Sequence, residues 1–369
     1  VRVLAGIPRC LLLDQGRAVA EGRPGVVLGS GVLGPLGLRP PDLVALAELA
    51  GTAGDDLEDE DALAAGLREA ARAGRVPGGS AAPGGAPSVA WEPVRSHPPT
   101  GVEVRGVVHR YAGGVEALRG VRLEVPPGQR LAIVGQNGSG KTTLVKHLNG
   151  LLRPDAGEVR VGGEPVGDRP VHVLARTVGF SFQDPDDQLF ERTVEREVRF
   201  GPGNLRLEPA ATERLVEAAL RSTGLAEHRD VHPHDLGPSD RKLLALAGVL
   251  AMDPAVLVLD EPTTGQDGPG VERIGAIVEA YAAAGRTVIA VTHDMGFAAE
   301  RFDRIVVMRE GEVVLDGSPV EVFAPEREAT LASAGLAPPV AARIGARLGL
   351  GSTPTLRHLF DALRGRRTT

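Results

Sequence analysis

The sequence predicts an α/β fold with a parallel core sheet, and three observations carry this prediction. Between residues 101 and 324, apolar runs of strand length alternate with helical stretches, a pattern typical of α/β domains. One such run, LAIV, leads directly into a glycine-rich turn and then a helix. Another, AVLVLDEP from Ala255 to Pro262, is apolar up to two acidic residues, as expected of a strand buried on both faces.

The composition limits the possible classes of protein. With 369 residues, 42% of them hydrophobic, the chain has room for two or three domains. Its 41 basic and 48 acidic side chains give a net charge of -7, so no overall basic field attracts nucleic acid. The longest apolar run we find, Leu243 to Met252, is too short to span a bilayer. The single cysteine, Cys10, cannot form an internal disulfide, which favours the reducing cytosol.

An internal repeat organises the start and the end of the chain. Residues 9–24, RCLLLDQGRAVAEGRP, align without a gap on residues 304–319, RIVVMREGEVVLDGSP. After a slip of three residues, 37–51 match 335–349, including a pair of prolines in each copy. Each copy predicts a hairpin followed by a short helix that begins near a proline.

The repeat suggests that residues 1–76 are the C-terminal tail of a first domain whose body would precede Val1. The alternative is that Val1 is a start codon translated literally and that the tail is a relic. The stretch PGGSAAPGGAPS, from Pro77 to Ser88, predicts a flexible linker, which we place over residues 77–100. The acidic stretch from Asp55 to Asp61 is interpreted as a solvated loop or helix face. Residues 325–369 form the second tail.

The glycine-rich turn is a phosphate-binding loop. Residues 135–142 read G-x-x-x-x-G-K-T between a strand and a helix, which is the context that this motif requires. The glycines let backbone N–H groups form a concave nest, and the helix N-terminus faces the same anion. Lys141 is expected to neutralise the β and γ phosphates, and the Thr142 hydroxyl to ligate Mg²⁺. A plain glycine-rich turn is the structural alternative.

Two further strand ends supply the residues for hydrolysis. Adjacent residues of a strand face opposite sides, so Asp260 can reach Mg²⁺ while Glu261 points towards an attacking water as general base. The run TVIAVTHD, from Thr287 to Asp294, ends with His293, which can hydrogen-bond a γ-phosphate oxygen or that water. A lone histidine at a strand end is more often structural, and only the neighbouring motifs favour the catalytic interpretation.

These motifs resemble those of the ATP-binding subunits of ABC transporters, most closely the cobalt and energy-coupling factor importer ATPases. The resemblance covers residues 101–324. GQNGSGKTT resembles the family's Walker A motif, VLVLDEP its Walker B motif, VTHD its switch region, and TTGQD, which ends at Asp267, its D-loop. The resemblance implies ATP and Mg²⁺ as ligands. The implied ATP-binding residues are Tyr111, Gly135, Gln136, Asn137, Gly138, Ser139, Gly140, Lys141, Thr142 and Thr143.

The resemblance also gives roles to residues that spacing alone does not single out. Tyr111 matches the aromatic residue that stacks on adenine, and Gln183 matches the Q-loop residue that touches Mg²⁺ or the water. The segment after Gln183, up to Leu205, resembles the stretch that meets the coupling helices of the membrane partner. From the residues alone, Tyr111 is a packed aromatic and Gln183 a loop amide.

The family's signature motif, L-S-G-G-Q, is degenerate here. By register it falls on Leu236, Gly237, Pro238, Ser239 and Asp240, and four of the five positions differ. Gly237 lacks the serine hydroxyl, Pro238 lacks an N–H, and Asp240 adds an anion near phosphate. Residues 238–240 also suit the start of a helix, so both interpretations can hold. We expect two unequal ATP sites in a pair of domains, the degenerate segment serving the weak or silent one.

The fold class that we predict is therefore an α/β P-loop ATPase with an N-terminal antiparallel β subdomain and a helical subdomain near residues 205–252. The resemblance implies an ATPase that energises uptake of a vitamin or of cobalt or nickel, on the cytoplasmic face of the membrane. Its implied partners are a second ABC ATPase domain and the transmembrane T- and substrate-binding S-components. The alternatives are a soluble tandem ABC ATPase acting on ribosomes or DNA, and a nucleotide-binding regulatory half with little turnover. The uncharged linker and acidic chain favour no nucleic-acid partner.

Overall fold

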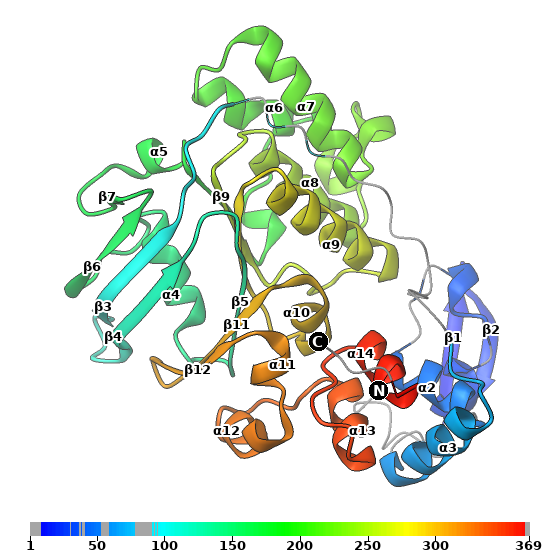
Figure 1. Cartoon of the computed structure of the whole chain (residues 1–369). Coiled ribbons are helices and arrows are strands. Elements are labelled where there is room, and N and C mark those ends of the chain that lie inside the picture. The colour runs from blue at the N-terminus through cyan, green and yellow to red at the C-terminus, as the bar shows by residue number, and fades with distance from the viewer. Residues whose placement is uncertain are drawn as a thin grey trace.

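A six-stranded sheet forms the centre of the computed structural model, which describes residues 9–29, 31–36, 38, 41–52, 59–77, 91, 93 and 95–365. The strands lie in the order β12-β11-β5-β10-β9-β8 (Figure 1). Their bounds are β5 Arg130–Val134, β8 Val178–Ser181, β9 Val256–Asp260, β10 Thr287–Val291, β11 Arg304–Arg309 and β12 Glu312–Gly317. Strands β11 and β12 pair antiparallel and the other neighbours pair in parallel, which confirms the predicted core sheet.

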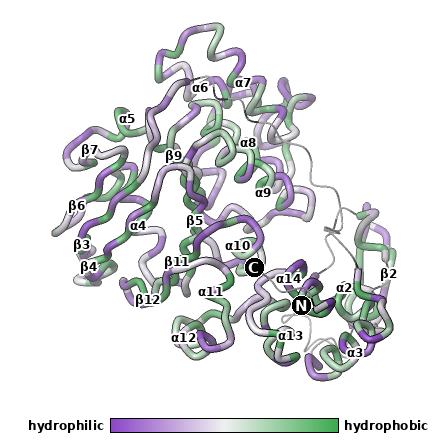
Figure 2. Tube along the Cα trace, viewed as in Figure 1, coloured by the Kyte–Doolittle hydropathy of each residue, from purple (hydrophilic) through white to green (hydrophobic). Residues whose placement is uncertain are grey.

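The parallel strands are apolar because helices and a second sheet cover both faces. All five residues of β9 are buried, and so are all five of β10. Figure 2 colours hydrophobic residues green, and green runs through the central sheet near the β5 label. Parallel strands aligned in this way bring their carboxyl ends to one edge of the sheet, where binding sites form in α/β folds. The phosphate loop, the acidic pair and His293 all follow strands of this sheet.

A four-stranded antiparallel sheet lies beside the core sheet. Its order is β4-β3-β6-β7, with β3 Val102–Arg110, β4 Glu116–Val125, β6 Ala156–Val161 and β7 Glu164–Pro165. Helix α4, Lys141–Leu148, packs between the two sheets, and Leu144 and Leu148 share one core with both. The antiparallel subdomain is therefore only partly N-terminal, since β6 and β7 follow the phosphate loop in the chain.

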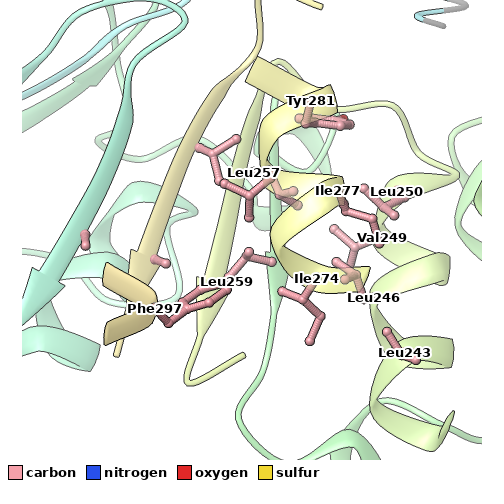
Figure 3. Packing of buried hydrophobic residues seen from close by; sticks show 14 of the residues in the cluster. Leu243, Leu246, Val249, Leu250, Leu257, Leu259, Ile274, Ile277, Tyr281 and Phe297 are labelled. Carbon is pink, nitrogen blue, oxygen red and sulfur yellow. The ribbon is translucent and has the colours of Figure 1, made fainter. Parts of the chain in front are cut away.

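Helices form a layer on the other side of the core sheet. They are α6 Val194–Asn204, α7 Pro209–Thr223, α8 Pro238–Leu250 and α9 Gly268–Ala283. Helices α8 and α9 lie against the strands, and α6 and α7 pack on α8. Figure 3 shows Leu246 and Val249 of α8 pointing towards Ile274 and Ile277 of α9 in the largest core. The helical subdomain begins earlier than predicted, because Thr193 caps α6 by accepting the N–H of Arg196. The short helix α5, Val171–Leu174, lies on the side of the antiparallel sheet, and α10 Met295–Arg301 and α12 Glu328–Ser333 follow β10 and β12 in the chain.

The two copies of the sequence repeat have the same local structure. In the first copy the elements are β1 Cys10–Asp14, β2 Arg17–Gly22, α1 Pro24–Leu28 and α2 Asp42–Ala50. In the second copy they are β11, β12, α11 Pro319–Val322 and α13 Val340–Leu348. A proline, Pro41 or Pro339, precedes the later helix, and a left-handed glycine ends it. The predicted hairpin and short helix are thus found in both copies.

The first copy packs on the second. Helix α3, Glu60–Arg72, follows α2, and α14, Leu356–Leu363, follows α13. The two pairs of helices lie side by side in Figure 1. They share a separate hydrophobic core in which Leu46 and Leu67 meet Ile344 and Leu359, each of them fully buried. We call the four helices α2, α3, α13 and α14 the tail pair.

Ion pairs across the tail pair involve part of the acidic stretch, in which Asp59 and Asp61 are exposed as predicted but Glu60 is not. The carboxylate of Glu60 accepts hydrogen bonds from Arg343 at 2.8 Å and from Arg347 at 2.9 Å, and its side chain is only 15% exposed. Asp61 accepts another from Arg347, and Asp59 caps α3. The residues of that stretch from 55 to 58 lie outside the described residues. Glu60 is therefore an interface residue that the charge run alone did not distinguish.

The end of the predicted linker is anchored on the ATPase domain. Trp91 is buried and stacks at 5.3 Å from Tyr281. Arg95 and His97 both bond Asp253, through the Arg95 N–H at 2.7 Å and the His97 ring at 2.8 Å. The predicted linker boundary at residue 100 is thus too late, because aromatic and charged side chains follow the Pro, Gly and Ala run. Residues 78–90, where that run lies, are outside the described residues.

None of the helices within the described ranges combines the length and the apolar character needed to cross a bilayer.

Candidate active site

A cavity of about 870 Å³ lies at the carboxyl edge of the core sheet. Its lining comes from the β3–β4 hairpin, the loops after β5, β8 and β10, the end of β9, the β11–β12 turn and the start of the second tail. Predicted residues in its lining are Tyr111, Gly135, Gln136, Asn137, Gly138, Gly140, Lys141, Thr142, Thr143, Gln183, Glu261 and His293. The topology therefore brings together residues that are up to 182 positions apart in the sequence.

The phosphate loop has the backbone that its glycines predict. Gly135, Gly138 and Gly140 have φ angles of 156°, 81° and 99°, in the region that side chains avoid. A Cβ on Gly135 would lie 2.3 Å from the carbonyl oxygen of Met308, so this glycine also permits a close approach of two chain segments. The Ser139 hydroxyl is buried and finds no partner among the described residues. The loop thus holds polar groups ready for an anion.

Lys141 curls over this loop. Its ammonium donates to the carbonyl oxygens of Gly135 at 2.8 Å and of Gln136 at 3.0 Å. Burial lowers the pKa of Lys141, and the charges of Glu261 and Asp260 oppose that effect. A buried ammonium above an anion-binding loop is suited to neutralise phosphate oxygens.

Asp260 and Thr142 supply two oxygen ligands side by side. The Thr142 hydroxyl donates to Oδ1 of Asp260 at 3.3 Å, and Asp260 is 4% exposed. Burial raises the pKa of Asp260, the hydrogen bond from Thr142 lowers it, and the charge of Glu261 raises it further. A buried carboxylate next to a hydroxyl fits the oxygen ligands that Mg²⁺ prefers. The residues therefore fit the ion that the motif implies.

Glu261 and His293 meet at the same edge. The ring Nδ1 of His293 lies 2.7 Å from Oε2 of Glu261, and the His293 N–H donates to the same oxygen at 3.3 Å. The main-chain N–H of Glu261 donates to Val291 at the end of β10, which ties the two strand ends together. The His293 side chain remains 64% exposed on the cavity, so the pair can reach a bound molecule.

Two residues that only the resemblance singled out also face the cavity. Tyr111 is 43% exposed, and its hydroxyl lies 3.0 Å from the Thr143 hydroxyl. Gln183 is exposed on the loop after β8. The ring of Tyr111 is thus at the mouth of the phosphate loop, where an aromatic face can cover a base.

The degenerate signature segment and Asp267 do not line this cavity. Gly237 precedes α8 and Pro238 is the first residue of that helix. The Ser239 hydroxyl hydrogen-bonds with Gln266 at 3.1 Å and with Asp267 at 3.2 Å. Asp267 itself caps α9 by accepting the N–H of Gly270. These residues face the D-loop of their own chain.

The sequence reasoning missed several residues around the site. Gly335, Leu336 and Ala337, from the second tail, line the cavity together with Thr264. Lys242, buried on α8, donates to the carbonyl oxygen of Glu261. Its signal was present in the composition, because the chain has only three lysines beside 38 arginines.

Comparisons with known proteins agree with the geometry. Residues 118–264 match the family model described as ABC transporter. The energy-coupling factor transporter ATP-binding protein EcfA1 of Methanospirillum hungatei is 43% identical over 223 residues, which are 60% of this chain and 80% of that protein. The cobalt import ATP-binding protein CbiO of Rhodobacter capsulatus is 42% identical over 236 residues, 63% of this chain and 84% of that one.

A longer relative matches almost the whole chain. An ABC transporter ATP-binding protein of Methanosarcina acetivorans is 36% identical over 350 residues, which cover 92% of this chain. The chain spans 56% of the length of that relative. The match includes regions outside the ATPase domain, since it extends beyond the 223 residues shared with EcfA1.

Among solved structures, the fold is similar to that of CbiO1 from Clostridium perfringens, described as part of the ABC transporter complex cbiONQ. The TM-score is 0.57 at 36% identity, over 67% of this chain and 95% of that one. The chain therefore belongs to the ATP-binding proteins of ABC transporters, within the energy-coupling factor and cobalt importer group, and carries their ATPase domain.

Proposed function

We propose that this chain binds and hydrolyses ATP to energise an energy-coupling factor type importer for a vitamin or a transition metal ion such as cobalt or nickel. The observation that carries the proposal is the meeting of Lys141, Glu261 and His293 around one phosphate loop. The names of the EcfA1 and CbiO relatives support the class of transporter. The peripheral location that we propose, on the cytoplasmic face of the membrane, follows from that class.

The proposed chemistry assigns a separate task to each group. Lys141 and the N–H groups of the phosphate loop hold the β and γ phosphates. Mg²⁺, held by Thr142 and Asp260 with Gln183 nearby, supplies charge neutralisation when bound. Glu261 accepts a proton from the attacking water, and His293 orients Glu261 through their hydrogen bond. Tyr111 covers the adenine.

Two variants test this proposal. Lys141→Ala should abolish Mg²⁺-dependent ATP affinity, measured by calorimetry on the folded chain. Glu261→Gln should retain that affinity and lower ATP turnover by about a hundredfold or more, because the general base is lost. Affinity that survives Lys141→Ala would contradict the assigned phosphate site. Turnover that survives Glu261→Gln would place hydrolysis elsewhere and favour a regulatory role for this half.

We infer that a second ABC ATPase domain completes the catalytic unit. Strand β11 pairs with β5 on one side and β12 on the other, whereas its repeat equivalent β1 pairs with β2 alone within the described residues. Leu11 and Leu13 of β1 are 50% and 59% exposed, although the corresponding Val306 and Met308 are fully buried. An unpaired edge with exposed leucines is suited to receive a strand. The occupant that the repeat favours is the strand before the phosphate loop of another ABC domain.

The two composite ATP sites of such a pair would be unequal. A signature segment caps the γ-phosphate bound to the opposite domain, and here Gly237 offers no hydroxyl and Pro238 no N–H. The one hydroxyl in the segment, that of Ser239, is engaged by Gln266 and Asp267 of its own chain. Each hydrogen bond lost to a charged group is worth roughly 1.5–3 kcal/mol. These features support a weak or silent second site.

A groove beside α6 supports docking on a membrane component. Phe190 and Phe200 are 61% and 42% exposed, and their rings meet edge to face with centroids 4.5 Å apart. They line a cavity of about 250 Å³ together with Leu244 and Met252 of the α8 region. Exposed paired aromatics next to an apolar cavity are typical of protein interfaces. We propose that the transmembrane T-component docks here, with the substrate-binding S-component above it.

Phe190→Asp tests this docking surface. The variant should keep the basal ATPase rate of the chain, because Phe190 lies outside the nucleotide cavity. It should lose co-purification with the membrane component and transport by the assembled importer. Normal assembly of this variant would contradict the proposed surface. The exposed Val171, on α5 and outside the groove, provides a matched control as Val171→Asp.

A further inference from the structure

Lys242 is a buried lysine with no place in the assigned chemistry. It is the fifth residue of α8, which begins at Pro238, and it is 6% exposed. Its ammonium donates to two main-chain carbonyl oxygens, that of Glu261 at 2.5 Å and that of Thr264 at 3.0 Å. It does not line the nucleotide cavity. A charge held in such a position costs solvation energy, so its contacts call for an explanation.

The acceptor residue has an unusual backbone. Glu261 has a φ angle of 50°, the left-handed region that residues with a Cβ seldom adopt. Such conformations persist where the surroundings hold them, and they concentrate at functional sites. The strand β9 ends at Asp260, so the turn at Glu261 redirects the chain directly after the sheet.

Hydrogen bonds at its N–H, its carboxylate and its carbonyl oxygen hold Glu261 in this conformation. Its N–H donates to Val291 at 2.8 Å, its carboxylate meets His293 at 2.7 Å, and its carbonyl oxygen accepts from Lys242. The first two contacts come from β10 and its following loop. The third comes from Lys242 of α8, a helix that precedes β9 in the chain. Without Lys242, the carbonyl oxygen would lose its charged donor and keep only the longer hydrogen bond from the Thr264 N–H at 3.3 Å.

We propose that Lys242 is a positioning residue for Glu261. Its ammonium fixes the carbonyl of the left-handed residue and thereby aims the carboxylate at the water that attacks the γ-phosphate. This inference rests on the proposed function, which gives Glu261 the role of general base. Lys242 touches no reacting atom and acts only through Glu261 and the adjoining D-loop.

The same contact joins two motifs that serve different ATP sites. Lys242 follows the degenerate signature segment on α8, and Ser239 of that segment bonds Gln266 and Asp267 of the D-loop. Gln266 donates back to the carbonyl oxygen of Ser239 at 3.1 Å. The first turns of α8 therefore contact both ends of the segment from Glu261 to Asp267: Lys242 bonds its start, and Ser239 bonds its end. A shift of this helix moves the general base of the chain's own site.

The test compares Lys242→Met, which removes the charge at similar length, with Lys242→Arg, which retains a cationic donor. We expect Lys242→Met to lower kcat for ATP roughly tenfold or more, the effect of losing one charged hydrogen bond. The KM for ATP and the Mg²⁺-dependent affinity by calorimetry should stay within about threefold of wild type. Lys242→Arg should recover most of kcat. Hydrogen exchange should rise in Lys242→Met at the amides of residues 261–266, but not within β9 or β10.

A matched control separates positioning from stability. Leu250→Ala, on the same helix and fully buried, should lower the melting temperature without this selective loss of kcat. Unchanged kcat in Lys242→Met would overturn the proposal, as would equal losses of kcat and nucleotide affinity. The kcat measurements use the chain assembled with its second ABC ATPase domain. Failure of the proposed function is a different result, since the wild-type assembly would then show no ATP turnover before any Lys242 variant was measured.

Discussion

At the scale of single residues, the glycines of the phosphate loop differ in what they permit. Gly135 needs both its φ angle and its missing side chain, because a Cβ would meet the Met308 carbonyl at 2.3 Å and the Ser139 hydroxyl at 2.6 Å. Gly138 has a φ of 81° but no atom within 4 Å of an added Cβ. A side chain at position 135 would therefore suffer both an unfavourable φ angle and a clash with backbone, whereas one at position 138 would suffer only the unfavourable φ angle.

We therefore predict that Gly135→Ala is far more damaging than Gly138→Ala. Gly138→Ala should cost about 1–2 kcal/mol of stability, the price of a left-handed residue with a Cβ. Gly135→Ala should abolish ATP binding and lower the melting temperature more, since Met308 belongs to the core strand β11. Thermal melting and ATP calorimetry on both variants provide the check. Equal effects would mean that the close approach of β11 to the loop is unimportant.

Asp260 gives a second prediction at this scale. Because burial raises its pKa, the ionised carboxylate is less stable in the folded chain than in the unfolded one, and at neutral pH it subtracts from stability. Asp260→Asn should therefore leave the stability of the nucleotide-free chain unchanged or raise it by up to about 1 kcal/mol. It should also remove the Mg²⁺ dependence of ATP affinity. A clear loss of nucleotide-free stability in urea unfolding would contradict this account.

The site residues that the sequence predicted belong to short, continuous motifs. Lys141 and Thr142 close a motif whose spacing is typical of phosphate-binding loops, and Asp260 and Glu261 stand at the end of a recognisable strand. Lys242 was not predicted, because its role depends on a contact between α8 and the end of β9 that no spacing reveals.

At the scale of elements, the hairpins of the two repeat copies have their irregular residues at equivalent positions. The bulge in the first hairpin lies between Leu12 and Leu13, and that in the second lies between Val307 and Met308, the aligned positions. The turns also match, with left-handed Gln15 in one and Glu310 in the other. Sequence similarity predicted the equivalence of these elements. It did not predict that one copy packs on the other, since that contact depends on side chains that differ between them.

The ion pairs of the tail pair are not symmetric between the two repeat copies, and they give a prediction at the scale of elements. Arg343 and Arg347 of α13 bind Glu60 of α3, whereas their repeat equivalents in α2 are Ala45 and Leu49. In a double-mutant cycle, Glu60→Gln and Arg343→Gln should show a coupling of about 1–2 kcal/mol, reduced from a fully buried pair by partial exposure. Urea unfolding followed at the tail pair measures it. Additive effects of the two substitutions would show that the pair contributes nothing.

The same carboxylate predicts a pH dependence. Burial raises the pKa of Glu60, but the hydrogen bonds and charges of Arg343 and Arg347 outweigh burial and lower the pKa below its ordinary value of 4.5. A lowered pKa means that the ion pair contributes its stability above pH 4.5 and loses it as the pH falls through the folded value. The tail pair should thus loosen in acid, as seen by hydrogen exchange. Glu60→Gln should lack this loss.

At the scale of the whole molecule, the ATPase domain was the predictable part and the arrangement of the tails was not. The alternation of strands and helices specified the core sheet, because parallel strands need helical crossovers. The tail pair brings helices α2 and α3 against α13 and α14, and no local pattern encodes a contact over such a separation in sequence. Linker composition predicted a break between parts, yet Trp91, Arg95 and His97 fasten the chain to the domain sooner than composition suggests.

The separate hydrophobic core of the tail pair predicts that it unfolds apart from the ATPase domain. Leu67 is fully buried in the tail pair and belongs to neither core of the ATPase domain. Leu67→Asp places an unpaired charge there, which costs about 3–5 kcal/mol, a large share of the stability of a small helical unit. We expect α2 and α3 to detach and exchange their amides rapidly, while the chain keeps Mg²⁺-dependent ATP binding.

The matched variant is Leu220→Asp, at a fully buried position in the largest core of the ATPase domain. It should destroy ATP binding, because that core supports β9 and α8 and through them Asp260 and Lys242. Hydrogen exchange and ATP calorimetry on both variants show whether the tail pair unfolds independently of the ATPase domain or together with it. If Leu67→Asp also removed ATP binding, the contact of Gly335 with Gln136 would be the route, since the second tail reaches the phosphate loop there. The tail pair would then be part of the nucleotide site, and its detachment would control catalysis directly.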